Sequence, residues 1–228
     1  MNRLEGVVSL IDKCNTLCDV GTDHGYVVEM ALNGGLCNKA IATDVNKGPL
    51  NSAINYLNSV DLGHKVDFRL GNGLKVVGEN EADCAIIAGM GGELISTILE
   101  ESKNVCRRFK FLVLQPMTCI EELRKYLYNN DFTIVEELLI KETHHYYFIL
   151  KVVNGKCNCQ DEIFYEFSKY LYDSRDKLFL EYMKKQIKIN EDIVCNLKKS
   201  SKCDIDDKID KVQGKINKIK GLVNSYEG

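Results

Sequence analysis

The sequence predicts an α/β protein in which a largely parallel sheet with one antiparallel strand precedes a smaller helical domain. Up to about residue 153, short apolar runs alternate with segments whose apolar residues have helical spacing, which is typical of βα units. Beyond residue 160 no strand pattern remains. We place the boundary in a polar, turn-rich stretch, which gives one domain at 1–155 and a second at 156–228.

Length and composition are those of an ordinary globular protein. The chain has 228 residues, of which 45% are hydrophobic and 28% charged. It contains no run of about 18 apolar residues, and residues 1–14 lack a signal-peptide pattern, so we expect a cytoplasmic protein without a membrane span. The net charge of −3 means that binding to nucleic acid would require local basic patches.

The cysteines predict neither a disulfide framework nor a metal site. The sequence has ten of them but no C-x-x-C pair, and Cys157 and Cys159 have no second half with zinc spacing. We therefore expect free thiols and no bound metal. Cys18 and Cys84 lie within apolar strand patterns and are interpreted as small buried hydrophobic residues.

The turn after the first expected strand carries the main functional prediction. A helix at 3–13 precedes this strand, which covers about 17–21, and the segment GTDHGY then leads into a helix that ends near residue 33. A dinucleotide fingerprint would place its second glycine where this chain has Asp23, whose carboxylate would repel a diphosphate. A carboxylate suits a cationic ligand, such as S-adenosylmethionine with its ammonium and sulfonium groups. An ordinary turn without a ligand is the alternative.

The ends of the next two strands also carry polar residues. The second strand, about 39–45, ends in Asp44 and Val45, and an acidic residue at this place can accept both ribose hydroxyls of a nucleoside. The third strand, 66–70, leads into a Gly-Asn-Gly turn at 71–73, whose amide could pair with an adenine edge. A solvated carboxylate and a plain turn are the alternatives. Two acidic strand ends in succession favour a nucleoside ligand.

A glycine-rich segment follows the fourth strand. This strand, about 82–88, is almost continuously apolar, as expected for a strand buried on both faces. Three glycines in the four residues 89–92 then indicate close approach of the backbone to a ligand, although a tight turn is the alternative. We favour a functional loop, because it would lie beside the loop of the first strand if the strand order reverses there.

The remaining elements of the first domain are three helices, one of them from residue 93 to about 101, and three strands. Gly48-Pro49 opens a helix, since proline is favoured at the first helical position. The fifth strand, 111–114, precedes the segment QPMT and a helix. The strands at 132–142 and 145–153 leave no room for a helix between them, so they predict an antiparallel hairpin with His144 and His145 as solvated residues near its tip.

The last part of the chain predicts a helical hairpin. An apolar stripe runs from Ile163 to Leu197, and apolar residues from Ile205 to Val223 then recur at intervals of four and three, which predicts a coiled-coil seam. Asp204 is a suitable N-cap for the second helix. Lysines gather late in the first helix, where a solvated face is the alternative to a nucleic-acid contact. They are Lys184, Lys185, Lys188, Lys198, Lys199 and Lys202.

Together these motifs resemble those of the bacterial tRNA (adenine-22-N1)-methyltransferase family. They are DVGTDHGY at 19–26, ATDVNKGPL at 42–50, GNGL at 71–74, AGMGGELI at 88–95 and LQPM at 114–117. The resemblance covers nearly the whole chain, and its most specific part combines the Asp-His pair with the Ala-Gly-Met-Gly-Gly segment. It implies a class I methyltransferase domain with a Rossmann-like sheet, joined to a C-terminal helical coiled-coil domain. It also implies methyl transfer from S-adenosyl-L-methionine to N1 of adenine 22 in tRNA.

The strand-end residues and the resemblance together give the expected site. Asp23 is the candidate for stabilising the charge on the methylated base or accepting its N6 proton, and His24 for orienting Asp23 or contacting the cofactor. The residues expected to bind the cofactor are Asp19, Gly21, Asp23, His24, Asp44, Val45, Gly71, Asn72, Gly73, Ala88, Gly89, Met90, Gly91 and Gly92. Those expected to contact the tRNA are Gly89, Met90, Gln115, Pro116, Lys184, Lys185 and Lys188.

Three positions depart from the family pattern, and other functions stay open. Asn72 stands where the family often has Asp, Met117 where it usually has Asn, and Gly25 where it has Ala. Met117 in place of asparagine removes a polar group near the target base. The alternatives are a methyltransferase for another RNA, a protein or a small molecule, a nucleotide-dependent oxidoreductase, and a non-catalytic protein whose coiled coil recruits a partner.

Overall fold

The computed structural model describes residues 1–156, 161–199 and 206–227, and the chain forms two compact units. Unit 1 is Met1–Glu166 and unit 2 is Phe167–Gly228. The sequence places the domain boundary earlier, at residue 155. The difference arises because the short helix α7 (Ile163–Glu166) is bound to the rest of unit 1. The side chain of a buried arginine, described below, donates hydrogen bonds to backbone carbonyls of this helix.

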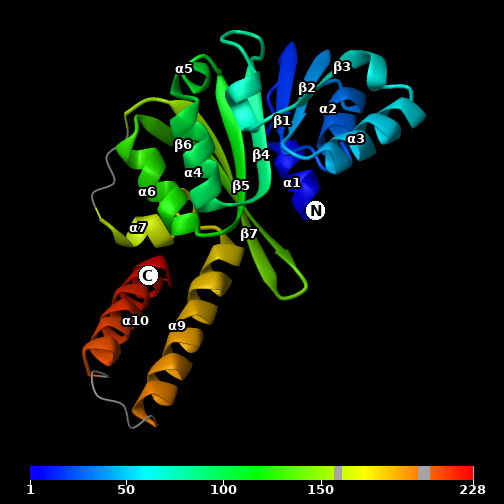
Figure 1. Ribbon diagram of the computed structural model, residues 1–228. Helices are drawn as coiled ribbons and strands as arrows, with labels where there is room; N and C mark the ends of the chain where they lie inside the picture. The colour runs from blue at the N-terminus through cyan, green and yellow to red at the C-terminus, as the bar shows by residue number, and fades with distance from the viewer. Residues whose placement is uncertain (157–160, 200–205, 228) are drawn as a thin grey trace. The chain divides into compact units, whose positions relative to one another are not determined.

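A seven-stranded sheet forms the centre of unit 1. Its strands are β1 (Thr16–Val20), β2 (Lys39–Asp44), β3 (Val66–Leu70), β4 (Cys84–Gly91), β5 (Phe111–Thr118), β6 (Phe132–Glu142) and β7 (His145–Asn154). Their spatial order is β3-β2-β1-β4-β5-β7-β6 (Figure 1). The first five strands are parallel, and β7 is antiparallel to both of its neighbours. The predicted fold class is therefore confirmed, including the hairpin with exposed His144 and His145 at its tip.

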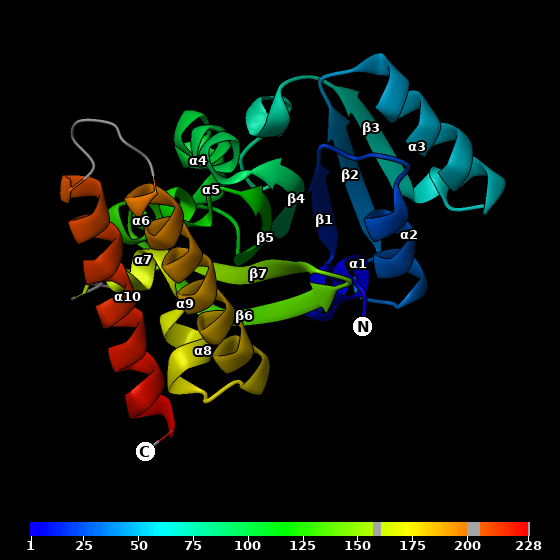
Figure 2. The same ribbon diagram turned by 90° about the horizontal axis from the view of Figure 1, so that it is seen from below.

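Helices cover both faces of this sheet (Figure 2). The helices on one face are α1 (Arg3–Ser9), α2 (Tyr26–Asn33) and α3 (Lys47–Ser59). Those on the other face are α4 (Gly92–Glu101), α5 (Lys103–Cys106) and α6 (Ile120–Asn129). Two short 3₁₀ helices, η1 (Gly63–Lys65) and η2 (Gly73–Val76), flank β3 in the chain. Because the central strands are covered on both sides, the side chains in their middle parts are buried, as at Ile86 and Ile87 of β4.

Two helix predictions need small corrections. α1 ends at Ser9 and is therefore shorter than the predicted 3–13. The N–H of Leu10 donates to the carbonyl of Val7, three residues earlier, which closes the helix. α3 begins two residues before Pro49, so this proline is the third helical residue and not the first. The missing N–H of Pro49 still falls in the first turn, where donors have no partner within the helix.

The ends of β4 and β5 run further than the sequence predicts. The segments around Gly89 and Pro116 lie within these paired strands, whereas the sequence indicated loops. β4 is bulged on either side of Met90, and Gly89 has φ of +80°, which glycine adopts without strain. Pro116 lies beyond the last β5–β7 pair at Leu114, so its missing N–H removes no ladder bond to β7.

Unit 2 contains the helices α8 (Lys169–Asp173), α9 (Lys177–Lys198) and α10 (Asp206–Glu227). α9 and α10 pack side by side as an antiparallel hairpin (Figure 1). The apolar stripe that starts at residue 163 does not lie on one continuous helix, as the sequence suggested. Ser168 and Asp176 each cap a new helix by accepting a backbone N–H. The coiled-coil seam stays a prediction. The predicted N-cap Asp204 lies outside the described residues, as do Lys202, Cys157 and Cys159.

A buried arginine on α6 contacts β6, β7 and α7 of unit 1. Arg124 of α6 is fully buried and forms an ion pair with Glu137 of β6, which is 1% exposed. Its guanidinium also donates to the backbone carbonyls of Tyr165 and Glu166, and its Cζ lies 4.8 Å from the ring centroid of Phe148. Such a pair stabilises the protein mainly by compensating two charges that have lost their water.

Substituting Arg124→Met is expected to lower the free energy of unfolding by about 3 kcal/mol, because it leaves Glu137 as an uncompensated buried charge. Denaturant unfolding of the purified variant measures this loss. The matched control is Lys125→Met, which removes an exposed cation from the same helix and is expected to change stability by less than about 0.5 kcal/mol. Equal effects of the two substitutions would contradict the stabilising role of the buried pair.

Candidate cofactor and substrate pocket

A pocket of about 620 Å³ opens at the carboxyl ends of the central strands of unit 1. β1 pairs with β2 on one side and with β4 on the other, so the strand order reverses beside β1, where open α/β sheets bind their ligands. The pocket is lined by Arg3, Leu4, Asp19, Val20, Gly21, Asp23, His24, Tyr26, Val27, Asp44, Val45, Asn46, Asn72, Gly73, Ala88, Gly89, Met90, Leu94, Ile98 and Met117. Its volume is in the range of small-molecule sites.

Most of the predicted cofactor residues meet in this pocket. Those that line it are Asp19, Gly21, Asp23, His24, Asp44, Val45, Asn72, Gly73, Ala88, Gly89 and Met90. The predicted residues of unit 1 that are not among the lining residues are Gly71, Gly91, Gly92, Gln115 and Pro116, and the predicted substrate residues of unit 2, Lys184, Lys185 and Lys188, are not among them either. Gly71 supports the pocket indirectly, since its N–H donates to the backbone carbonyl of Asp44. Gly92 instead faces α6, since an added Cβ would lie 2.1 Å from the carbonyl oxygen of Cys119.

The acidic wall of the pocket consists of two buried strand-end carboxylates. Asp19 is 6% exposed, and burial, together with the negative charge of Asp44, raises its pKa to about 6. Asp44 is 9% exposed, and its Oδ1 accepts the N–H of Asn46 at 2.7 Å. Two buried carboxylates that line the same pocket favour a ligand that brings positive charge or hydroxyl donors.

Asp23 and His24 lie at the open side of the pocket. Nε2 of His24 is 3.4 Å from Oδ1 of Asp23, and both side chains are more than half exposed. The ring of His24 stacks on Tyr26 with centroids 5.5 Å apart. Gly25 follows with φ of +74°, and an added Cβ there would lie 2.8 Å from Leu57, which gives a local reason for glycine in place of the family's alanine.

Gly21 allows the β1 turn and the β4 bulge to touch. An added Cβ on Gly21, which has φ of +76°, would lie 2.1 Å from Cε of Met90. The group that approaches Gly21 in this structure is therefore the side chain of Met90. Met90 and the exposed Met117 form an apolar wall beside the acidic one.

The side chain of Gln115 forms hydrogen bonds to two residues that line the pocket. It is fully buried, and its Oε1 accepts the N–H of Gly89 at 3.1 Å and Nη1 of Arg3 at 2.7 Å. Its Nε2 donates to the carbonyl of Pro116 at 2.8 Å. Gln115 therefore holds two lining residues in place, whereas the sequence predicted that it contacts the substrate directly.

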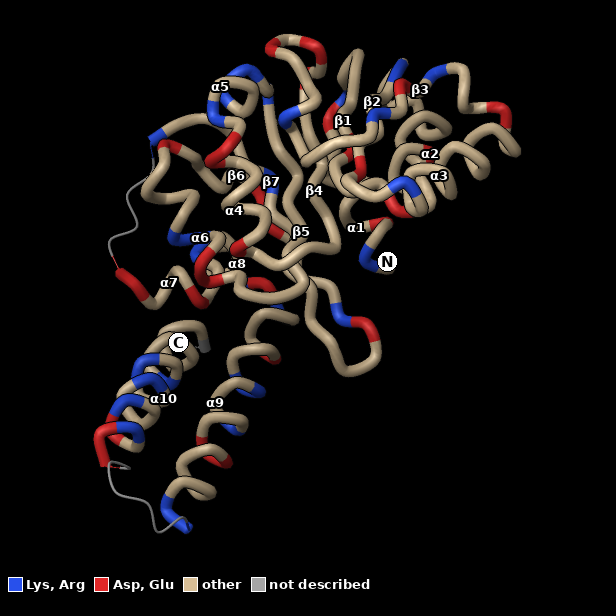
Figure 3. The backbone as a smooth tube through the Cα atoms, in the orientation of Figure 1, with Lys and Arg blue, Asp and Glu red and all other residues tan. Residues whose placement is uncertain are grey.

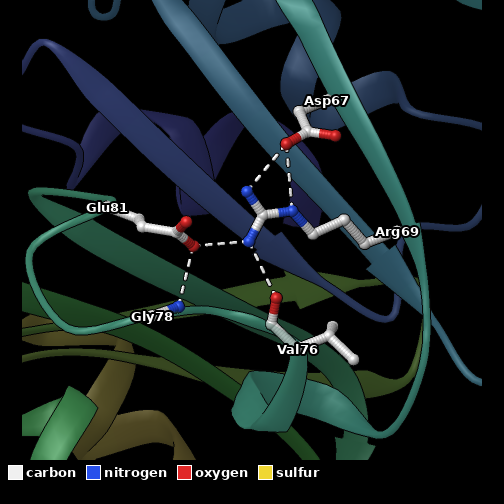
Figure 4. Close-up of polar contacts among 5 residues, drawn as sticks. All are labelled: Asp67, Arg69, Val76, Gly78 and Glu81. Atoms are coloured by element: carbon white, nitrogen blue, oxygen red, sulfur yellow. Dashed lines mark hydrogen bonds and ion pairs between the residues drawn. The ribbon is translucent and has the colours of Figure 1, made fainter.

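The loop that carries Asn72 is held against β3 by an arginine (Figure 4). The guanidinium of Arg69 binds Asp67 of its own strand and Glu81, and it donates to the carbonyl of Val76 at 2.7 Å. Glu81, whose carboxylate is the main reason that the pKa of Arg69 is raised, also accepts the N–H of Gly78. These bonds hold the backbone at Val76 and Gly78 against β3, close in the chain to the lining residue Asn72.

Sequence patterns did not point to several lining residues. Arg3 comes from α1, and Leu94 and Ile98 come from α4, which reach the pocket only through the packing of helices on the sheet. Tyr26 and Asn46 directly follow the predicted motifs at the ends of the first two strands. Extending each motif by one or two residues would have included them. Met117 was noted only as a departure from the family pattern.

The described residues contain neither a metal-binding cluster nor a membrane-spanning helix. Within 1–156, 161–199 and 206–227, no group of three or more His, Cys, Asp or Glu side chains is arranged to hold a metal ion. None of the helices in these ranges combines the length and the apolar character needed to cross a bilayer. The seven cysteines described are free thiols, with Cys18 and Cys84 buried as predicted.

The raised pKa of Asp19 predicts a specific pH dependence of stability. Its folded-state value of about 6 exceeds the ordinary 3.8, so between these values the folded protein holds a proton that the unfolded chain has lost. As the pH rises from 4 to 7, the free energy of unfolding of the wild type should fall by roughly 3 kcal/mol relative to that of Asp19→Asn. Denaturant unfolding at several pH values measures the difference, and parallel profiles would contradict it.

The chain was compared with known proteins by sequence and by structure. A sequence model of the TrmK family, described as tRNA (adenine(22)-N(1))-methyltransferase, matches residues 17–221. The tRNA (adenine(22)-N(1))-methyltransferase of Bacillus subtilis (strain 168) is 33% identical over 153 residues, which cover 67% of this chain and 64% of that enzyme. The matched region thus spans slightly less than two thirds of this relative.

Two solved structures with bound ligands share the whole fold. A Streptococcus pneumoniae protein, provisionally described as a tRNA (m1A22) methyltransferase and solved with S-adenosyl-L-methionine, is 30% identical with a TM-score of 0.86, over 97% of this chain and 98% of that chain. TrmK of M. capricolum, solved with S-adenosyl-homocysteine, is 27% identical with a TM-score of 0.83, over 98% and 97% of the two chains.

The match to the family sequence model extends through both units, and the sheet, the helical hairpin and the pocket agree with the predicted resemblance. The chain therefore belongs to the TrmK family of tRNA (adenine(22)-N(1))-methyltransferases.

Proposed function

We propose that the protein transfers a methyl group from S-adenosyl-L-methionine to N1 of adenine 22 in tRNA. The observation that carries this proposal is the pocket beside β1, which is lined by the buried carboxylates of Asp19 and Asp44 and by the apolar side chains of Met90 and Met117. Family membership and the ligands of the two solved relatives support the same chemistry. Because the substrate is tRNA, we propose the cytoplasm as the place of action.

The pocket residues fit S-adenosyl-L-methionine. Asp44, which lies at the end of β2 and lines the pocket, would accept the ribose hydroxyls, and Asn72 would pair with the adenine edge. Asp19 would balance the positive charge of the ligand, which would favour the ionised form of its carboxyl group. When bound, the cofactor supplies a methyl group already activated on a sulfonium, so the reaction needs no metal ion and depends on positioning.

The catalytic contribution of the chain is proposed for the open side of the pocket. N1 of adenine attacks with its lone pair, the N1–methyl bond forms as the sulfur–methyl bond breaks, and S-adenosylhomocysteine leaves. Asp23, beside His24, can stabilise the positive charge that appears on the base or accept the N6 proton that relieves it. The high exposure of the Asp23 side chain leaves it accessible to an incoming base.

The helices of unit 2 are proposed to contact the tRNA backbone. Lys184 and Lys188 are exposed on α9, Lys185 is half-buried, and both basic and acidic residues occur along α9 and α10 (Figure 3). Lys198 and Lys199 extend the basic surface to the end of α9. Such contacts bind RNA in a salt-dependent manner, and they would help to offset the cost of extruding the adenine, which is a few kcal/mol.

Incubation of the purified protein with tRNA and S-adenosyl-L-methionine is expected to yield 1-methyladenosine. Mass spectrometry of the nucleosides detects the product, and mapping of the RNA fragments locates it at position 22. A transcript with guanine at that position is the control and should stay unmodified. Methylation at another position, or of another class of molecule only, would contradict the assignment of substrate.

Asp23→Asn is expected to lower the turnover rate by about 100-fold, because it removes the carboxylate proposed to face the developing charge. The rate is measured at saturating cofactor, so that a change in cofactor affinity does not contribute. Asp61→Asn is the matched control, since Asp61 is exposed and lies outside the pocket. Full turnover by Asp23→Asn would remove this residue from the mechanism.

A further inference from the structure

A pair of thiols lies at the amino ends of the central strands. Cys14 shortly precedes β1, and Cys84 is the first residue of β4. The S–H of Cys84 donates to Sγ of Cys14 across 3.7 Å, although the two residues are 70 positions apart in the chain. The pocket opens at the other ends of these strands, and neither cysteine lines it. The pair is therefore a feature that the proposed function does not use.

Backbone contacts hold the two thiols together. The carboxylate of Asp83 accepts the N–H of Asn15 at 2.8 Å and that of Thr16 at 2.9 Å. The N–H of Asp83 donates in turn to the carbonyl of Thr16 at 2.8 Å. Asp83 directly precedes one cysteine and Asn15 directly follows the other, so these bonds fix the separation of the two backbones. Only the side chains then need to adjust to bring the sulfur atoms to the roughly 2 Å of a disulfide bond.

The two thiols differ in exposure and in acidity. Cys14 is half-buried, whereas Cys84 is fully buried. The hydrogen bond from Cys84 lowers the pKa of Cys14 against the effect of burial, and the same contact together with burial raises the pKa of Cys84. The side-chain charges that act on Cys14 are those of Asp83 and Asp12, which oppose its ionisation, and Lys110, which favours it. Cys14 is thus the thiol that ionises more readily and that a small solute can reach.

We propose that Cys14 and Cys84 form a reversible disulfide when the protein is exposed to hydrogen peroxide. The thiolate of Cys14 attacks one peroxide oxygen, the O–O bond breaks, and the leaving hydroxide takes up a proton to become water. The sulfur of Cys84 then attacks the sulfenic acid on Cys14, and its proton leaves with the hydroxyl group as a second water. The two thiols lose two electrons and two protons in all, and one peroxide becomes two waters.

Cys37 is the competing partner for Cys14. It is 5% exposed and belongs to the same apolar cluster as Cys84, against which Cys14 packs. The N–H of Cys14 donates to the carbonyl of Leu36 at 2.9 Å, so the backbone beside Cys37 is also close. Cys84 is favoured, because its sulfur is the one that forms a hydrogen bond to the sulfur of Cys14.

Peptide mapping after oxidation tests this proposal. The reduced protein is treated with hydrogen peroxide, the remaining thiols are blocked with iodoacetamide, and the digested peptides are analysed by mass spectrometry with fragmentation. The wild type is expected to give a Cys14–Cys84 link that dithiothreitol removes. Its melting temperature should rise on oxidation by at least about 5 °C, because the link closes a loop of some 70 residues and restricts the unfolded chain.

Variants assign the link to this pair. Cys14→Ser should give no link, and its melting temperature should not rise with peroxide. Cys37→Ala should keep both responses, as should Cys195→Ser, which removes an exposed cysteine of α9. A link between Cys14 and Cys37 would overturn the proposal. So would oxidation of Cys14 to the sulfinic acid while Cys84 stays a free thiol, or a wild type in which neither thiol reacts.

Discussion

The parallel pairing of β1 with β2 on one side and with β4 on the other is the constraint on which the rest of the site depends. This pairing aligns the register of the three strands, so that Asp19, Asp44 and the bulge at Gly89 all come to one edge of the sheet. None of these residues is close to the others in sequence. A ligand that bridges them must therefore lie across the switch in strand order, and its charges are selected by the groups already fixed there.

Charge is distributed unevenly around the pocket, and the packing beneath it maintains that distribution. The carboxyl group of Asp19 is buried at the cost of a raised pKa, which a cationic ligand would lower again by favouring the ionised form. Across the pocket, Gln115 holds both Gly89 and Arg3 through one buried amide oxygen. The backbone at Gly89 and the cationic side chain of Arg3 are thus held by a single residue that does not line the pocket.

The sequence predicted the parts of the site that depend on local order along the chain. Asp19, Asp23 and Asp44 follow directly from strand-end patterns. The continuation of β4 and β5 could not be predicted in this way, because the bulge at Gly89 arises from pairing with a distant strand. Arg3 was missed for the same reason, since only the packing of α1 on the sheet brings it to the pocket. In unit 2 the caps of α8 and α9 interrupt an apolar stripe that looked continuous.

The most direct test of this account is calorimetric titration of the purified protein with S-adenosyl-L-methionine, with S-adenosylhomocysteine and, for comparison, with NAD. The account predicts saturable uptake of the methyl donor and of its demethylated product at one site per chain, with no uptake of the dinucleotide. Binding of NAD alone, or no binding of the donor and its product, would contradict the claim that the carboxylates beside β1 form a cofactor site.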